Sequence, residues 1–350
     1  MAKIIGAQPL YDYGFDSKCC CSGQKALKIV VIGGGHGQST ALRGLKHYTP
    51  NLTGIVAVSD DGGGSGMLRE DLGILPPGDI RNCIMALSDT EPLLEKLMSY
   101  RFESGTLLGQ SFGNLFLAAM TEISSSFDEA VLRMCQVLSV KGKVLPVTNE
   151  NIFLEAEFEN GKTTLGESSI YLDKKINGCR IREVRLVPAH PQALAESVQE
   201  ILGADIVLIG PGSLYTSIIP NLLVDGIVEA IQGSDALKVY VCNIMTQDGE
   251  TEGYTVSDHI EALFQHSAPG LFDLCLTNSA PIPEEMVRRY AQEGAEPIRC
   301  DEDACHALGV EVLRCPLAAV GSGFVRHDSG NLARELIQIY AQRGMRIAGK

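Results

Sequence analysis

Short runs of apolar, β-branched residues recur along the chain and alternate with stretches whose apolar residues fall at helical spacing. The first run, residues 29–32, is typical of a parallel strand that is buried on both faces. A helix carrying Leu42 and Leu45 is predicted after it, with Ser39 as its N-cap. Similar strands are predicted at residues 55–58, 206–209, 239–242, 274–276 and 310–313, and helices at 79–87, 93–98 and 130–138. This alternation predicts an α/β fold with a doubly wound, mostly parallel sheet.

The segment around residues 150–187 has a different pattern, because apolar and polar residues alternate there. The alternation continues on both sides of Asn160-Gly161, a dipeptide that favours a tight hairpin turn. We therefore expect a small antiparallel β insert within a single α/β nucleotide-binding domain that spans residues 28–345. Residues 1–27, which contain a run of three cysteines, are expected to form a disordered N-terminal extension.

Charge and composition narrow the classes of partner. The chain has 29 Lys and Arg against 43 Asp and Glu, a net charge of −14 that repels phosphate backbones and anionic lipid. We expect no nucleic-acid partner, and the strand-length apolar runs predict no membrane insertion. The eleven cysteines include no C-x-x-C pair, and residues 1–27 lack the apolar core of a signal peptide, so a cytoplasmic location is predicted.

Glycine-rich loops follow several predicted strands, at the edge of the sheet where ligands bind in open α/β folds. The first loop fails the dinucleotide fingerprint, because Gln38 stands where the third glycine is needed. Its backbone N–H groups can still hold a phosphate at a helix start, and a tight turn without a ligand is the alternative. Residues 210–217 combine glycines with hydroxyl groups, which also suits an anion. Together these loops predict a ligand that carries phosphate.

Carboxylates and amides stand at the same strand ends. Asp60 and Asp61 could hold a ribose diol, bind Mg²⁺ beside a phosphate or act as a base, and ordinary turn acidity is the alternative. Asp79 and Asn82 fall on the first turn of a predicted helix, where Asp79 could equally be only an N-cap. Asn114 could cap its own helix or contact a ligand.

Six motifs in order along the chain resemble the bacterial gluconeogenesis factor family. They are residues 32–35 (IGGG), 59–63 (SDDGG), 76–82 (PPGDIRN), 113–115 (GNL), 210–218 (GPGSLYTSI) and 243–247 (NIMTQ). The resemblance covers about residues 27–340 and implies the Rossmann-like fold of the related 2-phospho-L-lactate transferases. It also implies a cytoplasmic protein that binds UDP-sugars such as UDP-N-acetylglucosamine. Members of the family are needed for cell shape and wall synthesis during growth on gluconeogenic carbon sources.

The resemblance also implies which residues bind the ligand. Tyr290 and Arg326 match positions that contact the uracil, which suits a ring that stacks on a base and a guanidinium that donates to its carbonyl oxygens. The remaining ligand-binding residues expected are Gly34, Gly35, His36, Gly37, Asp60, Asp61, Asp79, Asn82, Asn114, Gly210, Gly212, Ser213, Tyr215, Thr216 and Asn243. No cofactor is required on this interpretation. A protein partner in wall synthesis and a homo-oligomer are expected.

Two other functions remain as alternatives. A transferase like the relatives would use a nucleotide-activated donor, with Asp61 holding Mg²⁺. The transferase branch has Asn-Pro where this chain has Leu214-Tyr215 and lacks the motif at residues 243–247, which favours the regulatory branch. The seven histidines form no triad spacing, so a regulator without turnover is preferred. An NAD(P) oxidoreductase is disfavoured by the broken glycine fingerprint.

Overall fold

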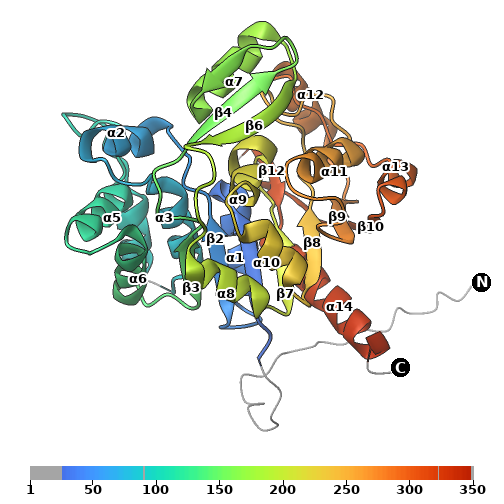
Figure 1. Cartoon of the computed structure of the whole chain (residues 1–350), viewed down its shortest axis with the longest axis horizontal. Helices are drawn as coiled ribbons and strands as arrows, with labels where there is room; N and C mark the ends of the chain where they lie inside the picture. Colours follow the sequence, from blue (N-terminus) through green and yellow to red (C-terminus); the bar gives the residue numbers. More distant parts are fainter. Residues whose placement is uncertain (1–25, 90, 322, 348–350) are drawn as a thin grey trace, which may run out of the picture.

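A seven-stranded parallel sheet forms the centre of the protein in the computed structural model, which describes residues 26–89, 91–321 and 323–347 (Figure 1). The strand order is β10-β9-β8-β7-β1-β2-β3. The strands are β1 (Ile29–Gly33), β2 (Leu52–Val56), β3 (Lys143–Pro146), β7 (Ile206–Ile209), β8 (Leu237–Val241), β9 (Leu274–Asn278) and β10 (Glu311–Cys315). The expected α/β class, with a doubly wound parallel sheet, is confirmed.

The strand order reverses between β1 and β7. From β1 the chain builds outward through β2 to β3, and it then returns to β7 and builds outward on the other side to β10. Ile29 pairs with Leu52 on one side and with Ile206 on the other. The connections after β1 and β7 leave in opposite directions, and the resulting crevice at their carboxyl ends is the usual ligand site of such sheets.

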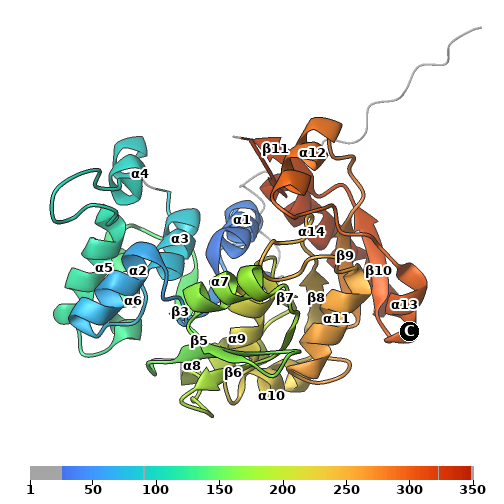
Figure 2. The same cartoon turned by 90° about the horizontal axis from the view of Figure 1, so that it is seen from above.

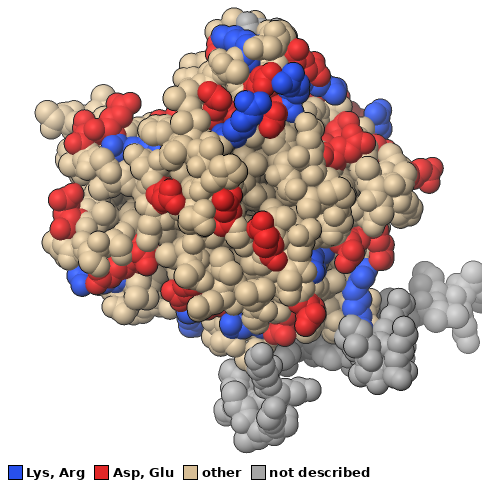
Figure 3. All heavy atoms as spheres, viewed as in Figure 1, with Lys and Arg blue, Asp and Glu red and all other residues tan. Residues whose placement is uncertain are grey.

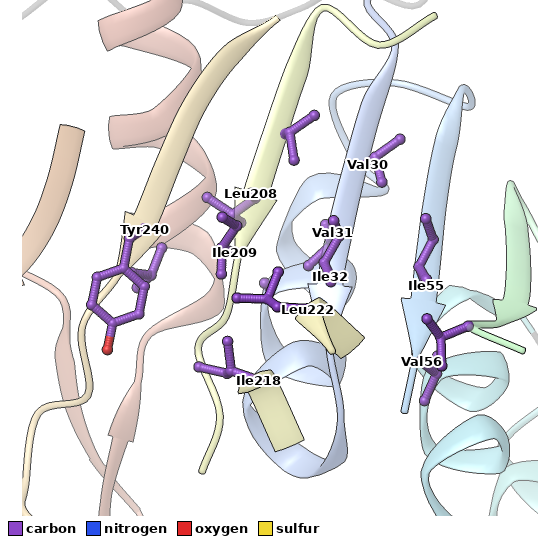
Figure 4. Packing of buried hydrophobic residues seen from close by; sticks show 14 of the residues in the cluster. Val30, Val31, Ile32, Ile55, Val56, Leu208, Ile209, Ile218, Leu222 and Tyr240 are labelled. Carbon is purple, nitrogen blue, oxygen red and sulfur yellow. The ribbon is translucent and has the colours of Figure 1, made fainter. Parts of the chain in front are cut away.

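Helices cover both faces of the sheet. One face carries α1 (Gly35–Leu45), α3 (Gly78–Leu87) and α14 (Ser329–Ile347), and the other carries α8 (Ala195–Leu202), α9 (Ile219–Leu222) and α10 (Ile227–Gly233). Because both faces are buried, the strands are continuous apolar runs; Val30, Val31 and Ile32 are at most 1% exposed. Figure 4 shows Ile218 and Leu222 packed against these central strands.

The remaining helices lie to either side. Seen from above, α2, α4, α5 and α6 form one flank, and α11, α12 and α13 lie on the opposite flank beside β9 and β10 (Figure 2). Their bounds are α2 (Gly63–Leu72), α4 (Pro92–Ser99), α5 (Phe112–Glu122), α6 (Phe127–Val137), α11 (Val256–Gln265), α12 (Glu284–Gln292) and α13 (Glu302–Ala307). A two-stranded antiparallel sheet, β11 (Ala318–Gly321) and β12 (Phe324–His327), was not expected from the sequence.

The structure differs from the sequence-based expectations at two helix starts and in one glycine-rich loop. The first helix begins at Gly35, and Ser39 lies inside it with its hydroxyl donating to the His36 carbonyl (3.0 Å). The glycine-rich segment after the strand predicted at residues 55–58 is partly helical, because α2 begins at Gly63. Asp79 lies in the first turn of α3 and is not its N-cap, a position held by Pro77. At α1 and α2 the first helical residues are glycines, which a sequence pattern assigns to a loop.

The antiparallel insert stands above the carboxyl ends of the central strands (Figure 1). Its strands β4 (Phe153–Phe158), β5 (Thr163–Leu165) and β6 (Ile181–Val187) pair in the order β5-β4-β6, with the predicted turn at Asn160-Gly161 between the first two. A helix that the sequence did not predict, α7 (Glu167–Asn177), connects β5 to β6. Over the insert acidic and basic side chains mix on the surface (Figure 3), and Arg182 and Arg185 both pair with Glu157.

Arg69 ties the insert to α2. Its guanidinium donates to Asn151 Oδ1 (2.6 Å) and to the Ile152 carbonyl, and it lies 3.7 Å from the centre of the Phe153 ring. Arg69 is only 5% exposed, so it is a structural contact between two elements and not a surface arginine.

The structure can be compared with the expectations about the N-terminal extension and about membrane insertion only within the described residues. The expected N-terminal extension lies outside the described residues apart from residues 26 and 27, and the domain limits of 28–345 stay a prediction. Within the described residues, no helix combines the length and the apolar character needed to cross a bilayer.

Candidate functional site

Two cavities adjoin at the carboxyl ends of the central strands. The glycine cavity, of about 300 Å³, is lined by His36, Gly37, Thr40, Pro211, Gly212, Ser213, Asn243, Ile244, Met245, Thr246, Gln247, Tyr290, Val325, Arg326 and His327. The acidic cavity, of about 390 Å³, is lined by Asp60, Gly62, Glu167, Ser168, Ile170, Tyr171, Leu172, Thr216, Gln247, Gly249 and Glu250. Gln247 lines both cavities, and its side-chain oxygen accepts a hydrogen bond from Ser213 Oγ (2.8 Å).

The floor of the glycine cavity is backbone from the two loops at the switch point. The first turn of α1 lies against the loop after β7, since a Cβ on Gly37 would stand 2.4 Å from the Pro211 carbonyl oxygen. Asn243 Nδ2 donates to the Gly212 carbonyl (2.8 Å) and holds this loop in place. Backbone N–H groups at the start of a helix favour an anion, so this floor can hold a phosphate.

One wall of the glycine cavity combines an aromatic ring with a guanidinium. Tyr290 projects from α12, and its hydroxyl accepts a hydrogen bond from the Val325 N–H (3.1 Å). Arg326 follows on β12 and is exposed, with its guanidinium 5.4 Å from the centre of the Phe324 ring. These two side chains suit a planar, carbonyl-bearing group that stacks and accepts hydrogen bonds.

The histidines of the glycine cavity are neutral near pH 7. Burial lowers the pKa of His327 to about 4, and its ring contacts the Cys242 carbonyl (3.2 Å). Burial also lowers the pKa of His36, and the positive charges of Arg326 and Arg81 lower it further. Arg326 therefore supplies positive charge to this cavity while the two imidazoles serve as neutral polar groups.

Three carboxylates face the acidic cavity. Glu250 is 3% exposed, and its Oε1 accepts hydrogen bonds from the backbone N–H groups of Tyr215 (2.9 Å) and Thr216 (3.0 Å). Its Oε2 has no hydrogen-bond partner among the described residues. Burial raises the pKa of Glu250 to about 7, against the effect of those two N–H groups. Burial and the charge of Asp60 also raise the pKa of Glu167.

Asp79 lies against the first glycine loop, where a Cβ on Gly34 would stand 2.8 Å from its Oδ2, and it lines neither cavity. Its carboxylate accepts a hydrogen bond from the Gly35 N–H at the start of α1. Burial raises the pKa of Asp79 to about 7, and the negative charge of Asp60 adds to the shift. Asp79 therefore occupies one of the backbone donors that a helix N-terminus offers to an anion.

The predicted site residues fall into three groups by position. The glycine cavity is lined by His36, Gly37, Gly212, Ser213, Asn243, Tyr290 and Arg326. Asp60 and Thr216 line the acidic cavity. The third group lines neither cavity and consists of Gly34, Gly35, Asp61, Asp79, Asn82, Asn114, Gly210 and Tyr215. The predicted residues that do line a cavity are separated by up to 290 positions in the chain, from His36 to Arg326.

Several residues in the third group have protein partners of their own. Tyr215 is 2% exposed, and its hydroxyl pairs with that of Tyr254 (2.9 Å) in the core, so this residue serves the site through its backbone N–H. Asn114 is 3% exposed, and Ser111 caps its helix by accepting from the Asn114 N–H (3.2 Å). Asn82 Oδ1 accepts from Arg81 (2.9 Å).

The acidic cavity also contains residues that the sequence did not single out. They are Glu167, Ser168, Tyr171, Gly249 and Glu250, from α7 and from the segment after the motif at residues 243–247. Gln247 was quoted only as part of that motif. A carboxylate beside the last motif was the available signal for Glu250, whereas Glu167 follows a hairpin that carried no functional signal.

The aspartates behind β2 bear on the Mg²⁺ expected for a transferase. Asp60 lines the acidic cavity, with Oδ1 accepting from the Gly62 N–H (2.8 Å). Asp61 turns to the insert, where its Oδ1 accepts from the Ser168 N–H (2.9 Å). The described residues contain no group of three or more metal-ligating side chains close enough to hold an ion. A Mg²⁺ held by one carboxylate and ligand phosphates would therefore depend on Asp60.

Known proteins resemble the chain over most of its length. Residues 29–318 match the family described as 2-phospho-L-lactate transferase CofD. The gluconeogenesis factor of Bacillus subtilis is 49% identical over 318 residues, covering 91% of this chain and 99% of that protein. The putative gluconeogenesis factor of Thermoanaerobacterium thermosulfurigenes is 52% identical over 310 residues, covering 89% and 96% of the two chains.

The fold is shared with a solved structure as well. A crystal structure of a protein from Bacillus halodurans superposes with a TM-score of 0.86 at 47% identity, covering 89% of this chain and 100% of that one. Sequence identity of about half over nearly the whole chain is sufficient to assign the family. The chain belongs to the gluconeogenesis factor family, within the wider family of 2-phospho-L-lactate transferase CofD.

Proposed function

We propose that this chain is a cytoplasmic regulatory protein that binds a UDP-sugar of the UDP-N-acetylglucosamine type in the two adjoining cavities. On this proposal it couples the supply of that precursor to cell shape and wall synthesis during growth on gluconeogenic carbon sources. It acts through a protein partner in wall synthesis, as a homo-oligomer, and requires no cofactor.

The observation that carries the proposal is the wall formed by Tyr290 and Arg326 beside the glycine loops. The tyrosine ring can stack on a pyrimidine, and the guanidinium can donate to its carbonyl oxygens. The floor at Gly37 and Gly212 offers backbone donors to a diphosphate without bulky side chains. Both recognition elements line one cavity, which supports a uridine nucleotide as the ligand.

A transferase is the second candidate function. Asp60 lines the acidic cavity and can serve a Mg²⁺ ion or an acceptor hydroxyl, and the matching family carries a transferase description. Such an enzyme would bind GDP with Mg²⁺ in preference to UDP. Product formation that is lost in Asp60→Asn while nucleotide binding persists would favour it.

Isothermal titration of the purified full chain separates the two functions. Heat is a suitable signal because the chain contains no tryptophan to report binding by fluorescence. We expect UDP-N-acetylglucosamine to bind, GDP with Mg²⁺ to remain silent, and Arg326→Ala to weaken binding at least tenfold. Arg288→Ala, at an exposed arginine outside both cavities, is the matched control. Binding of GDP with Mg²⁺ but not of UDP-N-acetylglucosamine would refute the regulatory proposal.

A further inference from the structure

We infer that an arm formed by residues 91–108, which comprises α4 and the loop after it, is the surface through which this chain pairs with a second copy of itself. The inference rests on the homo-oligomer of the proposed function, because it names the surface that joins the copies. Seen from above, the arm lies at an outer corner of the flank that also contains α2, α5 and α6 (Figure 2). It lines neither cavity of the site.

The helix α4 has two apolar stripes, whereas packing against its own chain uses one. Leu94 and Met98, four positions apart, form the inner stripe; Met98 is 2% exposed, and Leu94 packs against the core beside it. Leu93 and Leu97, also four positions apart, form the outer stripe and are 79% and 43% exposed. A surface helix normally has one apolar side, which faces the core. The outer stripe is therefore available for a contact outside this chain.

The loop after α4 extends the apolar surface. Tyr100, Leu107 and Leu108 are 48%, 40% and 59% exposed. The loop is ordered by its own backbone, since the Phe102 N–H donates to the Gln110 carbonyl (2.9 Å). These side chains are thus held in water by a defined structure, and a contiguous exposed apolar patch marks an interaction surface.

The charged residues of the arm suit a second copy of the chain. They are Glu91, Glu95, Lys96, Arg101 and Glu103, and none of them forms an ion pair among the described residues. The arm is therefore nearly neutral on a chain whose net charge is −14, so two copies repel each other less here than at their acidic faces. A glutamate of one arm can also pair with the lysine or arginine of the other.

The arm is large enough to supply most of a dimer interface. Fifteen of its 18 residues are exposed. A standard interface uses about 20–30 residues of each partner, so the arm needs only a few neighbouring residues to complete it. A twofold axis brings the same surface of both copies together, which is the commonest arrangement in homo-oligomers.

Sedimentation equilibrium of the full chain tests the inference. We expect wild type to have the mass of two chains at micromolar concentrations. Leu93→Ser should weaken the dimer at least tenfold, and Leu93→Ser combined with Leu108→Ser should leave a monomer. Ile176→Ser is the matched control, because Ile176 is 77% exposed on α7, outside the arm, and its replacement should leave the dimer intact. Since all three side chains are exposed, the variants should fold and keep their affinity for UDP-N-acetylglucosamine within twofold.

Hydrogen exchange in wild type locates the interface without any substitution. The amides of residues 91–108 should exchange more slowly at concentrations where the dimer forms than where the monomer predominates. A dimer whose arm exchanges equally fast at all concentrations, or that Leu93→Ser leaves intact, would overturn the arm as the interface alone. A wild-type chain that stays monomeric would overturn the arm and the homo-oligomer together. Silence with UDP-N-acetylglucosamine in a chain that dimerises through the arm would overturn the proposed nucleotide site alone.

Discussion

Replacing Gly37 with alanine tests how closely the two glycine loops of the site are held together. The new Cβ would stand 2.4 Å from the Pro211 carbonyl oxygen, 2.6 Å from its carbon and 2.9 Å from the Gly212 nitrogen. Observed Cβ atoms essentially never approach closer than 3.0 Å, so the loops must separate by at least 0.6 Å, the difference between 3.0 and 2.4 Å. All three neighbours are backbone atoms, so side-chain rotation cannot relieve the contact.

The cost follows from overpacking and helix propensity. Overpacking of this kind costs typically about 1–3 kcal/mol, and the rigid backbone places it near the upper end. Alanine in a helix recovers up to about 1 kcal/mol relative to glycine, which leaves a net loss of about 2 kcal/mol. For roughly 320 residues at about 2.1 cal/mol/K per residue, that loss lowers Tm by about 3 °C. We also expect UDP affinity to fall more than tenfold, because the displaced loops form the phosphate floor.

Calorimetric unfolding and titration with UDP check both numbers. Gly233→Ala is the matched control, since this glycine ends α10 and its new Cβ would lie 3.5 Å from Leu202, an ordinary contact. The control should keep its UDP affinity and unfold at the wild-type temperature or slightly above it. If Gly37→Ala unfolded within about 1 °C of wild type and bound UDP normally, the close approach of the loops would not matter as argued.

Three further predictions follow from single contacts. Asp79 and Glu250 have a pKa of about 7 in the folded chain, whereas carboxylates of the unfolded chain have a pKa of about 4. Between these values the folded state binds more protons, so the free energy of unfolding should fall as the pH rises from about 4 to 7. Urea titrations across this range should show a smaller fall in Asp79→Asn. Tyr290→Phe removes the hydroxyl that accepts from the buried Val325 N–H, so it should lower the free energy of unfolding by about 1 kcal/mol and leave UDP affinity within twofold. Tyr290→Ala also removes the ring and should lower UDP affinity tenfold. Equal UDP affinity of the two variants would argue against stacking. Arg69→Lys should cost about 2 kcal/mol and speed amide exchange in β4, and unchanged exchange there would contradict the tie to the insert.

The sheet was largely predictable because its strands are buried on both faces. Continuous apolar runs identify β1, β7 and β8, and their alternation with helices gives the fold class. The strand β3 (Lys143–Pro146) was missed, since a four-residue edge strand with a lysine and a proline at its ends has no such run. The helix α7 was missed because only Ile170 among its apolar residues is buried, whereas Tyr171, Leu172 and Ile176 are exposed, so the helix has no continuous apolar face.

The site was predictable where motifs follow strands and not where the chain folds back. The glycine cavity is built largely from such motifs, and seven of its 15 lining residues were named in advance, Tyr290 and Arg326 through the family resemblance. Glu167 and Glu250 stand 83 positions apart in segments without a motif, and only the tertiary structure brings them together. Tyr215 was expected to line the cleft with its neighbours, but a single π-helical turn, residues Leu214–Ile218, directs its ring into the core.

The pairing of β1 with β7 determines when the binding site can form during synthesis. Lys28 and Asp205, which join the starts of these strands, are 177 positions apart. At about 5–20 residues per second, the ribosome needs roughly 10–35 s to make that interval. During these seconds β7 has not yet been synthesised, so one edge of β1 has no partner strand and Gly37 has no contact with Pro211. A ligand in this crevice can therefore stabilise the finished chain, but it cannot rescue a nascent one.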